Sequence, residues 1–189
     1  MTAAPKFTVD DLLALGEDVR AELIDGEIVY KALPFPEHSL PQGYLDRWLH
    51  RFARKPGGKW PGGWWIGPEV HVIYKTEQVY CHDIAGWKRD SLASLPSGWV
   101  PVRPDWVCEI LSRGHEKRDL ADKLATLHAA GVPNYWIIDH IKRVLFLYEY
   151  EAGGYRVRLV HAGEVISAAP FEACELRTAV IFGDEDDEE

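Results

Sequence analysis

The sequence contains little cysteine and no long apolar run. Its three cysteines, Cys81, Cys108 and Cys174, are odd in number and far apart, which excludes a disulfide framework and a Cys-x-x-Cys metal site. No apolar stretch reaches the roughly 18 residues that a membrane span needs. The N-terminus also lacks the basic and then apolar pattern of a signal peptide. These absences predict a cytoplasmic protein with reduced thiols and no membrane partner.

The chain also lacks an excess of basic residues, which argues mildly against nonspecific binding to duplex nucleic acid. The formal net charge is -9, and residues 184–189 are all carboxylates. Removing these six from the 30 acidic residues leaves 24 against 21 basic ones. Because a block of like charges repels itself and buries nothing, we expect residues 184–189 to form a disordered acidic tail. A regulatory or nucleic-acid-mimicking tail is the alternative.

Several enzyme motifs are missing as well. None of the eight histidines falls in His-Glu-x-x-His or at a Cys/His zinc spacing, and no Gly-x-Ser-x-Gly, P-loop or Gly-x-Gly-x-x-Gly is present. Zinc, serine hydrolase and nucleotide-cofactor chemistry are therefore not predicted. His82 is the histidine of most interest because it precedes Asp83, although neighbouring strand residues are expected to point to opposite faces.

The hydrophobic pattern predicts one α/β domain over residues 1–183. A short helix capped by Thr8 is expected first, and a helix from Pro36 to about Arg54, with Pro41 near its first turn, comes later. A Gly- and Pro-rich loop over 55–63 follows the second helix. A hairpin is predicted over 21–30, with its turn after Asp25, and further strands over 64–74, 77–87, 105–112, 134–139, 144–150 and 155–160. The stretch from Glu109 to Asp139 reads as strand, helix and strand with short links, so its two strands should be parallel.

Glu109 interrupts an apolar strand that such a unit should bury on both faces. A buried carboxylate requires a cation, and the candidates are a metal ion and Lys123. Lys123 is predicted on the helix face that packs on the sheet because it shares a helical stripe with Leu120, Leu124, Leu127 and Ala130. From these residues alone, a catalytic site and a buried structural ion pair between Glu109 and Lys123 are equally favoured.

Asp83 is a second carboxylate in an apolar strand, and Asp105 could assist it or merely begin its own strand. Two carboxylates on neighbouring strands repel unless a divalent cation lies between them, and oxygen ligands suit Mg²⁺ or Mn²⁺. With the ammonium of Lys123 nearby, such a site could transfer phosphoryl groups: the metal acidifies a water and the lysine stabilises charge in the transition state.

Five segments in order, AELIDGEIV, HDIAGW, PDWVCEILS, RDLADK and GVPNYWIIDH, resemble the bacterial family of putative restriction endonucleases in the PD-(D/E)XK superfamily. The resemblance covers roughly residues 21–155. It implies a restriction-endonuclease-like mixed sheet flanked by helices, metal binding by Asp83 and Glu109, and a catalytic lysine that has moved to the following helix, at Lys123. It also implies a catalytic role for Glu22, which could touch a metal-held water or a second metal.

The chain departs from the family pattern at several positions. His82 stands where the family usually has proline, Leu127 replaces a usual tyrosine, and residues 112–115 replace a Ser-Pro-Ser-Thr type turn. These changes concern substrate contacts more than the metal site. Ser112 could cap the next helix or touch a phosphate. A basic patch that could steer a phosphate backbone is predicted at Arg113, Lys117 and Arg118.

Together these observations predict an endonuclease that hydrolyses DNA phosphodiester bonds with Mg²⁺ or Mn²⁺, and a homodimer is plausible. The tryptophans around the loop, Trp60, Trp64 and Trp65, favour core or interface packing over base stacking. The main alternative is a catalytically inactive nuclease-fold binding or regulatory module. Another metal-dependent hydrolase on the same scaffold is a third possibility, because fold does not determine substrate.

Overall fold

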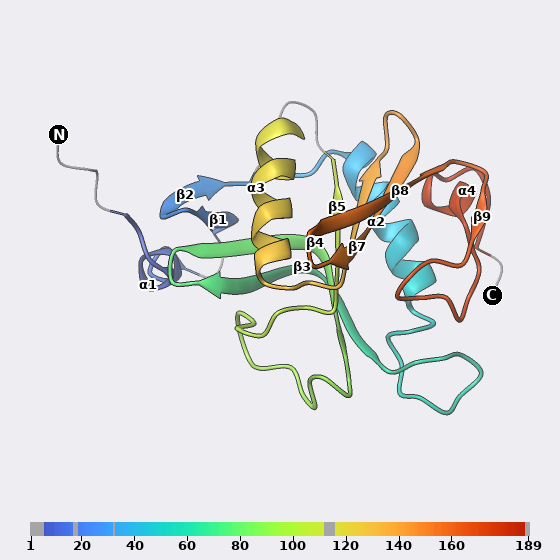
Figure 1. Ribbon diagram of the computed structural model, residues 1–189, viewed down its shortest axis with the longest axis horizontal. Helices are drawn as coiled ribbons and strands as arrows, with labels where there is room; N and C mark the ends of the chain where they lie inside the picture. Colours follow the sequence, from blue (N-terminus) through green and yellow to red (C-terminus); the bar gives the residue numbers. More distant parts are fainter. Residues whose placement is uncertain (1–5, 17–18, 32, 112–115, 188–189) are drawn as a thin grey trace.

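The computed structural model describes residues 6–16, 19–31, 33–111 and 116–187, and the side chains of 116–120 lie outside this description. The helices of the described chain are α1 (Val9–Leu13), α2 (Pro36–Leu49), α3 (Glu116–Ala129) and α4 (Thr178–Ile181). Its strands are β1 (Ala21–Ile24), β2 (Glu27–Tyr30), β3 (Trp64–Lys75), β4 (Gln78–Lys88), β5 (Trp106–Ile110), β6 (Asn134–Asp139), β7 (Val144–Glu151), β8 (Gly154–His161), β9 (Val165–Ile166) and β10 (Leu176–Arg177). Figure 1 shows their arrangement.

The main sheet is mixed, with the strand order β2-β1-β4-β5-β6-β7-β8 and with β3 also paired to β4. β5 and β6 are parallel, and α3 connects them, which confirms the predicted strand-helix-strand unit. β3 pairs with β4 along almost its whole length. Since a strand has two edges, β1 and β5 must share the other edge of β4. This shared edge positions the candidate site.

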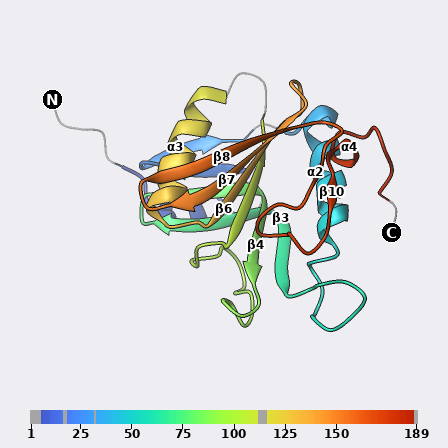
Figure 2. The same ribbon diagram turned by 45° about the vertical axis from the view of Figure 1, so that its right-hand side comes forward.

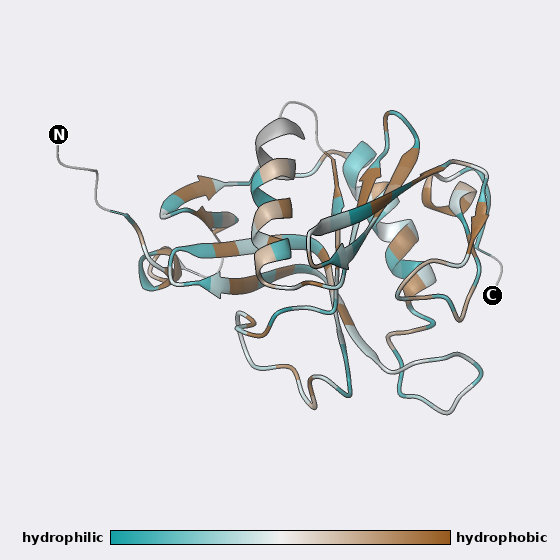
Figure 3. Cartoon of the chain, in the orientation of Figure 1, coloured by the Kyte–Doolittle hydropathy of each residue, from teal (hydrophilic) through white to brown (hydrophobic). Residues whose placement is uncertain are grey.

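The two faces of the sheet carry separate cores. Alternate residues of β5 point to opposite faces: Cys108 and Ile110 pack in a cluster with α2, whereas Val107 packs in a cluster with Leu127 of α3. α2 and α3 consequently cover different faces, as Figure 2 shows. The apolar positions of both helices are visible in Figure 3. The predicted α/β architecture with a sheet flanked by helices is confirmed.

Local sequence accounts for the first elements. Thr8 caps α1, as expected from the sequence, and Asp11 completes a capping box with it. The β1–β2 hairpin turns at Asp25 and Gly26, which both have positive φ, 51° and 82°. A Cβ atom at Gly26 would lie 2.6 Å from the Cβ of Lys6, so this turn requires glycine for space as well as for conformation.

α2 is shorter than predicted, ending at Leu49 instead of near Arg54, and Pro41 lies inside it, shortly after its first turn. The helix ends here because the backbone carbonyls of the next residues accept hydrogen bonds from the far end of the following Gly- and Pro-rich loop. The carbonyl of Arg51 accepts the N–H of Gly62 at 3.1 Å, and that of Phe52 accepts the N–H of Trp64 at 3.1 Å.

The acidic segment that was predicted to be disordered is described as far as Asp187. Its carboxylates form ion pairs with arginines of the domain, namely Asp184 with Arg143, Glu185 with Arg177 and Asp187 with Arg51. Residues 188–189 lie outside the described residues, and the domain boundary at residue 183 stays a prediction. Within the described ranges, no helix combines the length and apolarity required to cross a membrane.

Candidate active site

The candidate site lies where β1 and β5 separate along β4. β1 pairs with β4 at Leu23 and Val79, whereas β5 pairs with it from Ile84 and Cys108 onward. Residues 80–83 of β4 therefore lie between the two ladders, and their backbone groups on this edge need other partners. We call this region the fork.

Charged side chains supply the backbone hydrogen bonds at the fork. Glu22 Oε1 accepts the N–H of Cys81 at 3.0 Å, and Lys31 Nζ donates to the Cys81 carbonyl at 2.8 Å. Asp83 Oδ2 accepts the N–H of Ile110 at 2.8 Å. An unsatisfied buried backbone group would cost about 1–3 kcal/mol, so the fork needs polar side chains irrespective of any catalytic role.

Asp83 is buried and is held by groups from two other segments. His38 Nε2 of α2 lies 3.1 Å from Oδ2, and Lys31 Nζ lies 3.3 Å from Oδ1. Gln42, one helical turn after His38, donates to the Asp83 carbonyl at 2.7 Å. Burial by itself raises the pKa of Asp83, but the His38 hydrogen bond and the charge of Lys31 hold that pKa well below its usual range.

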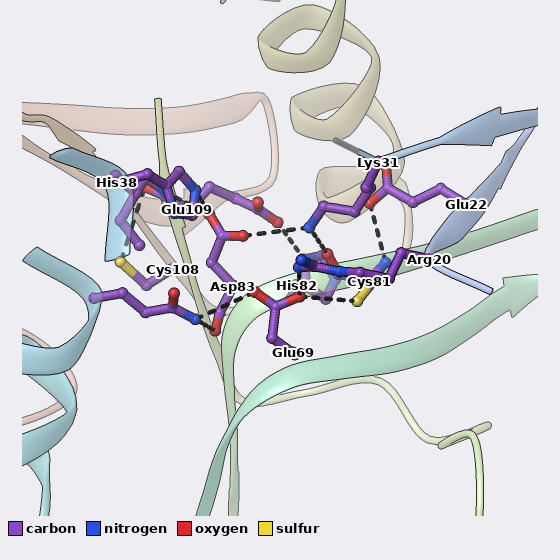
Figure 4. A network of polar contacts seen from close by, with 12 residues as sticks. Arg20, Glu22, Lys31, His38, Glu69, Cys81, His82, Asp83, Cys108 and Glu109 are labelled. Atoms are coloured by element: carbon purple, nitrogen blue, oxygen red, sulfur yellow. Dashed lines mark hydrogen bonds and ion pairs between the residues drawn. The ribbon is translucent and has the colours of Figure 1, made fainter. Parts of the chain in front are cut away.

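Glu109 and Glu22 share Lys123. The ammonium of Lys123 lies 3.1 Å from Oε1 of each carboxylate, and all three residues are buried. Burial alone would lower the pKa of Lys123, yet Glu109 and Glu22 raise it well above its ordinary value. For Glu22, burial raises the pKa, but the charges of Lys123 and Lys31 bring it below its ordinary value. The structure thus brings all four predicted residues together, and Figure 4 shows the carboxylates among their partners.

His82 also reaches the site, through Glu109, whereas its neighbour Asp83 contacts His38 of α2. Its Nδ1 lies 2.6 Å from Oε1 of Glu109, and its Nε2 lies 2.8 Å from the hydroxyl of Tyr74. Because a carboxylate accepts, this pairing assigns a hydrogen to Nδ1, and Nε2 pairs with the Tyr74 hydroxyl. His82 is fully buried.

The strand alternation breaks at this point. Tyr80 and His82 face α3 and Glu109, whereas Ile84, two residues further, packs in the cluster on the α2 side. Opposite Asp83 in β3, Glu69 has φ 53°, a left-handed conformation that is uncommon for residues other than glycine. The irregularity therefore affects Asp83 and Ile84, which both lie toward α2, while His82 and Asp83 keep the opposite directions expected of strand neighbours.

Four residues of this network were missed from the sequence, and these are Lys31, His38, Gln42 and Glu69. The four-residue spacing of His38 and Gln42 after Pro36 could have indicated a shared helix face. Glu69 offers no such signal. Its carboxylate lies 2.7 Å from Arg20 Nη2 and 3.4 Å from Gln42 Nε2. It therefore braces α2 against β3 beside Asp83.

Other predicted residues lie elsewhere. The carboxylate of Asp105 accepts the N–H of Lys88 at 2.8 Å, which makes Asp105 part of the backbone connection at the end of β4. Trp64 is in the core, as its predicted packing role implied. Ser112 and Arg113 lie outside the described residues, as do the side chains of the other two members of the predicted basic patch, Lys117 and Arg118.

The donor chemistry of the fork suits a hard divalent cation. Within the part of the chain that the structure describes, no three or more His, Cys, Asp or Glu side chains gather closely enough to hold an ion by themselves. Mg²⁺ commonly takes only one or two carboxylates and completes its coordination with waters and substrate phosphate. Asp83 and Glu109 fit that requirement, because they place two buried carboxylates on adjoining strands.

The mixed sheet with this fork defines a restriction-endonuclease-like α/β protein. Its fold is similar to that of a putative nuclease of the DUF820 family from Anabaena variabilis ATCC 29413, with a TM-score of 0.76 and 20% identity over 94% of this chain and 98% of that one. The chain belongs to the Uma2 family, described as putative restriction endonuclease, whose family model matches residues 9–180. No protein among those with curated functions matches it. The family resemblance inferred from the sequence is therefore confirmed.

Proposed function

We propose that this protein is an endonuclease that hydrolyses phosphodiester bonds of DNA with the help of Mg²⁺ or Mn²⁺. The observation that carries the proposal is the pair of buried carboxylates at the fork, Asp83 and Glu109, each held by one imidazole and one ammonium group. Family membership supports nuclease chemistry. DNA as the substrate, the metal and a homodimeric state are parts of the proposal.

The charge balance of the fork favours a divalent cation. Three carboxylates, Glu22, Asp83 and Glu109, face the two ammonium groups of Lys31 and Lys123. These five groups together carry one net negative charge in a buried region, where electrostatic interactions are strong. A divalent cation would reverse the sign and match a phosphodiester, which carries one negative charge.

Each residue has a separate role in this proposal. Asp83 and Glu109 would hold the ion, which when bound would supply positive charge beside the scissile phosphate and lower the pKa of an attacking water. Lys123 would stabilise the negative charge that develops on the phosphate oxygens. Glu22 holds Lys123 and the β4 backbone, so its contacts favour a positioning role over the direct catalytic one expected from the family resemblance.

A plasmid-nicking assay with Mg²⁺, Mn²⁺ or EDTA tests the proposal. We expect cation-dependent nicking by the wild-type chain and a loss of at least about 100-fold in Asp83→Asn and Glu109→Gln, because each removes a carboxylate from the ion site. Asp90→Asn, which changes an exposed acidic residue, is the matched control. Full activity in both site variants would refute the assignment.

A second candidate function is a nuclease-fold binding module without catalysis. It is favoured by the backbone hydrogen bonds that Glu22 and Asp83 accept, because these bonds explain the presence of both carboxylates without any catalytic role. Calorimetric titration with Mn²⁺ separates the two candidates. Binding that is lost in Glu109→Gln supports the endonuclease, whereas a folded wild-type chain that binds no ion supports the module.

A further inference from the structure

The acidic C-terminal segment rests on an arginine surface, which we define as Arg51, Arg143 and Arg177. Asp184 pairs with Arg143, Glu185 Oε2 lies 3.2 Å from Arg177, and Asp187 pairs with Arg51. These carboxylates come from four consecutive residues, which span at most about 13 Å. Three guanidinium groups from different parts of the fold are thus gathered along one short run of negative charge.

The contact between Arg51 and Asp187 has the geometry of phosphate recognition. Arg51 Nη1 and Nη2 donate to the two carboxylate oxygens at 2.7 and 2.8 Å, a bidentate arrangement that guanidinium makes equally with phosphate. Both side chains are less than 10% exposed. Because the desolvation of a buried pair offsets much of its attraction, such a contact holds the segment weakly compared with a ligand of higher charge.

The arginine surface adjoins a cavity and an aromatic ring. A cavity of about 310 Å³ beside the pair is lined by residues that include Trp48, Trp60, Arg177 and Asp187. Arg51 lies over the Trp60 ring at 4.9 Å, and Lys59 Nζ lies over the same ring at 4.6 Å. Cationic groups beside a tryptophan face, with space next to them, are the elements from which single-stranded nucleic acid sites are built.

The arginine surface is also connected to the fork through α2. Figure 1 shows the C-terminal segment beside the end of α2. The beginning of that helix supplies His38 to Asp83. The eleven helical steps from His38 to Leu49 correspond to about 17 Å, so α2 extends from the fork to a point two residues before Arg51.

We propose that the arginine surface, together with Trp60, binds the phosphate backbone of a nucleic acid strand, and that the acidic C-terminal segment covers it by occupying the phosphate positions. This inference rests on the proposed function, since it assigns a contact surface to the DNA substrate. The DNA substrate and the acidic segment then compete for the same guanidinium groups. DNA that contacts only one or two of these groups displaces the segment less readily and so binds more weakly.

Fluorescence anisotropy with a labelled single-stranded DNA oligonucleotide in EDTA tests this competition without cleavage. The test variant is the triple change Asp184→Asn, Glu185→Gln and Asp187→Asn. The matched control is Asp10→Asn, Glu27→Gln and Asp90→Asn, which removes the same number of charges from exposed residues of the N-terminal half. We expect the test variant to bind about tenfold more tightly than the control. We also expect its affinity to depend more steeply on salt. For three phosphate contacts, the slope of the logarithm of the binding constant against the logarithm of the salt concentration should become more negative by about two.

Adding Arg143→Gln and Arg177→Gln to the test variant should return its affinity to that of the control, since both arginines are about 40% exposed and can be changed without disturbing the core. Equal affinity of test and control variants would overturn the proposal. If the wild-type chain does not nick DNA but the test variant binds more tightly, the proposed activity fails and the arginine surface stands. If the wild-type chain nicks DNA with a cation but the test and control variants bind equally, the proposed activity stands and the arginine surface is refuted.

Discussion

Asp83 and Glu109 have the same kinds of partner, one imidazole and one ammonium group each, in two different environments. The partners of Glu109 are almost fully enclosed, with His82 at 0% and Lys123 at 7% side-chain exposure. Lys31, which pairs with Asp83, is 20% exposed. His38 and Lys31 are also 45 and 52 residues distant in sequence from Asp83.

This difference indicates which half of the fork can move during function. The Glu109 half is Glu109 with His82 and Lys123, and the Asp83 half is Asp83 with His38 and Lys31. Around Glu109, every partner is packed between β4, β5 and α3, so movement would leave a charge buried without compensation. Around Asp83, the ammonium of Lys31 sits on a long side chain that reaches water, and it can move away when another cation approaches. We therefore expect the Glu109 half to act as a fixed frame and the Asp83 half to admit the ion and the substrate.

The largest expected effect is on stability, in Lys123→Met. This change leaves Glu22 and Glu109 buried without their shared cation, so it should lower the free energy of unfolding by about 3–5 kcal/mol. Lys31→Met should cost clearly less, because Asp83 keeps the Ile110 N–H and His38 as partners. Urea denaturation in EDTA measures both. Equal losses in the two variants would show that the halves do not differ as we describe.

A smaller loss is expected for Tyr74→Phe, which removes the hydroxyl that faces His82. The Nε2 atom of a fully buried His82 would be left without its partner, at a cost of about 1–3 kcal/mol. Tyr150→Phe removes the hydroxyl of a more exposed tyrosine, and it serves as the control. Thermal unfolding of the two variants compares them, and a Tyr74 variant as stable as its control would argue against a rigid Glu109 half.

The smallest expected effect is on the pH dependence of stability. The pKa of Glu22 in the fold lies below its ordinary value of 4.5, so the unfolded chain binds more protons in the acid range. The stability that ionised Glu22 contributes is therefore complete above about pH 4.5 and is lost as the pH falls below it. In urea denaturation across this range, Glu22→Gln should flatten the acid decline. The exposed-residue variant Glu27→Gln should retain it, and identical slopes would contradict the prediction.

Much of the secondary structure followed from local signals. The helix cap at Thr8, the turn at Gly26 and the parallel pair joined by α3 were all predicted from spacing and composition. Glu109 and Lys123 could also be selected from burial pattern alone, since a carboxylate in an apolar strand and a lysine on an apolar stripe are both costly without a partner. Asp83 was selected mainly through family resemblance.

The contacts of Asp83 could not be derived in the same way. His38 and Lys31 belong to segments whose patterns say nothing about their distance from β4. The contact of His82 with Glu109 was not predicted either, because it depends on how β4 lies against β5. Such contacts between strands distant in sequence leave no local signal.

By itself, then, the sequence determined the order of the elements, the apolar faces that they bury and two of the charged residues that needed partners. Only the tertiary structure decided that β1 and β5 share one edge of β4 and leave a fork between them. The physical reason is that the backbone groups of residues 80–83 and of Ile110 must find hydrogen bonds once the ladders separate. Glu22, Lys31 and Asp83 supply those bonds, and in doing so they gather the charges of the proposed site.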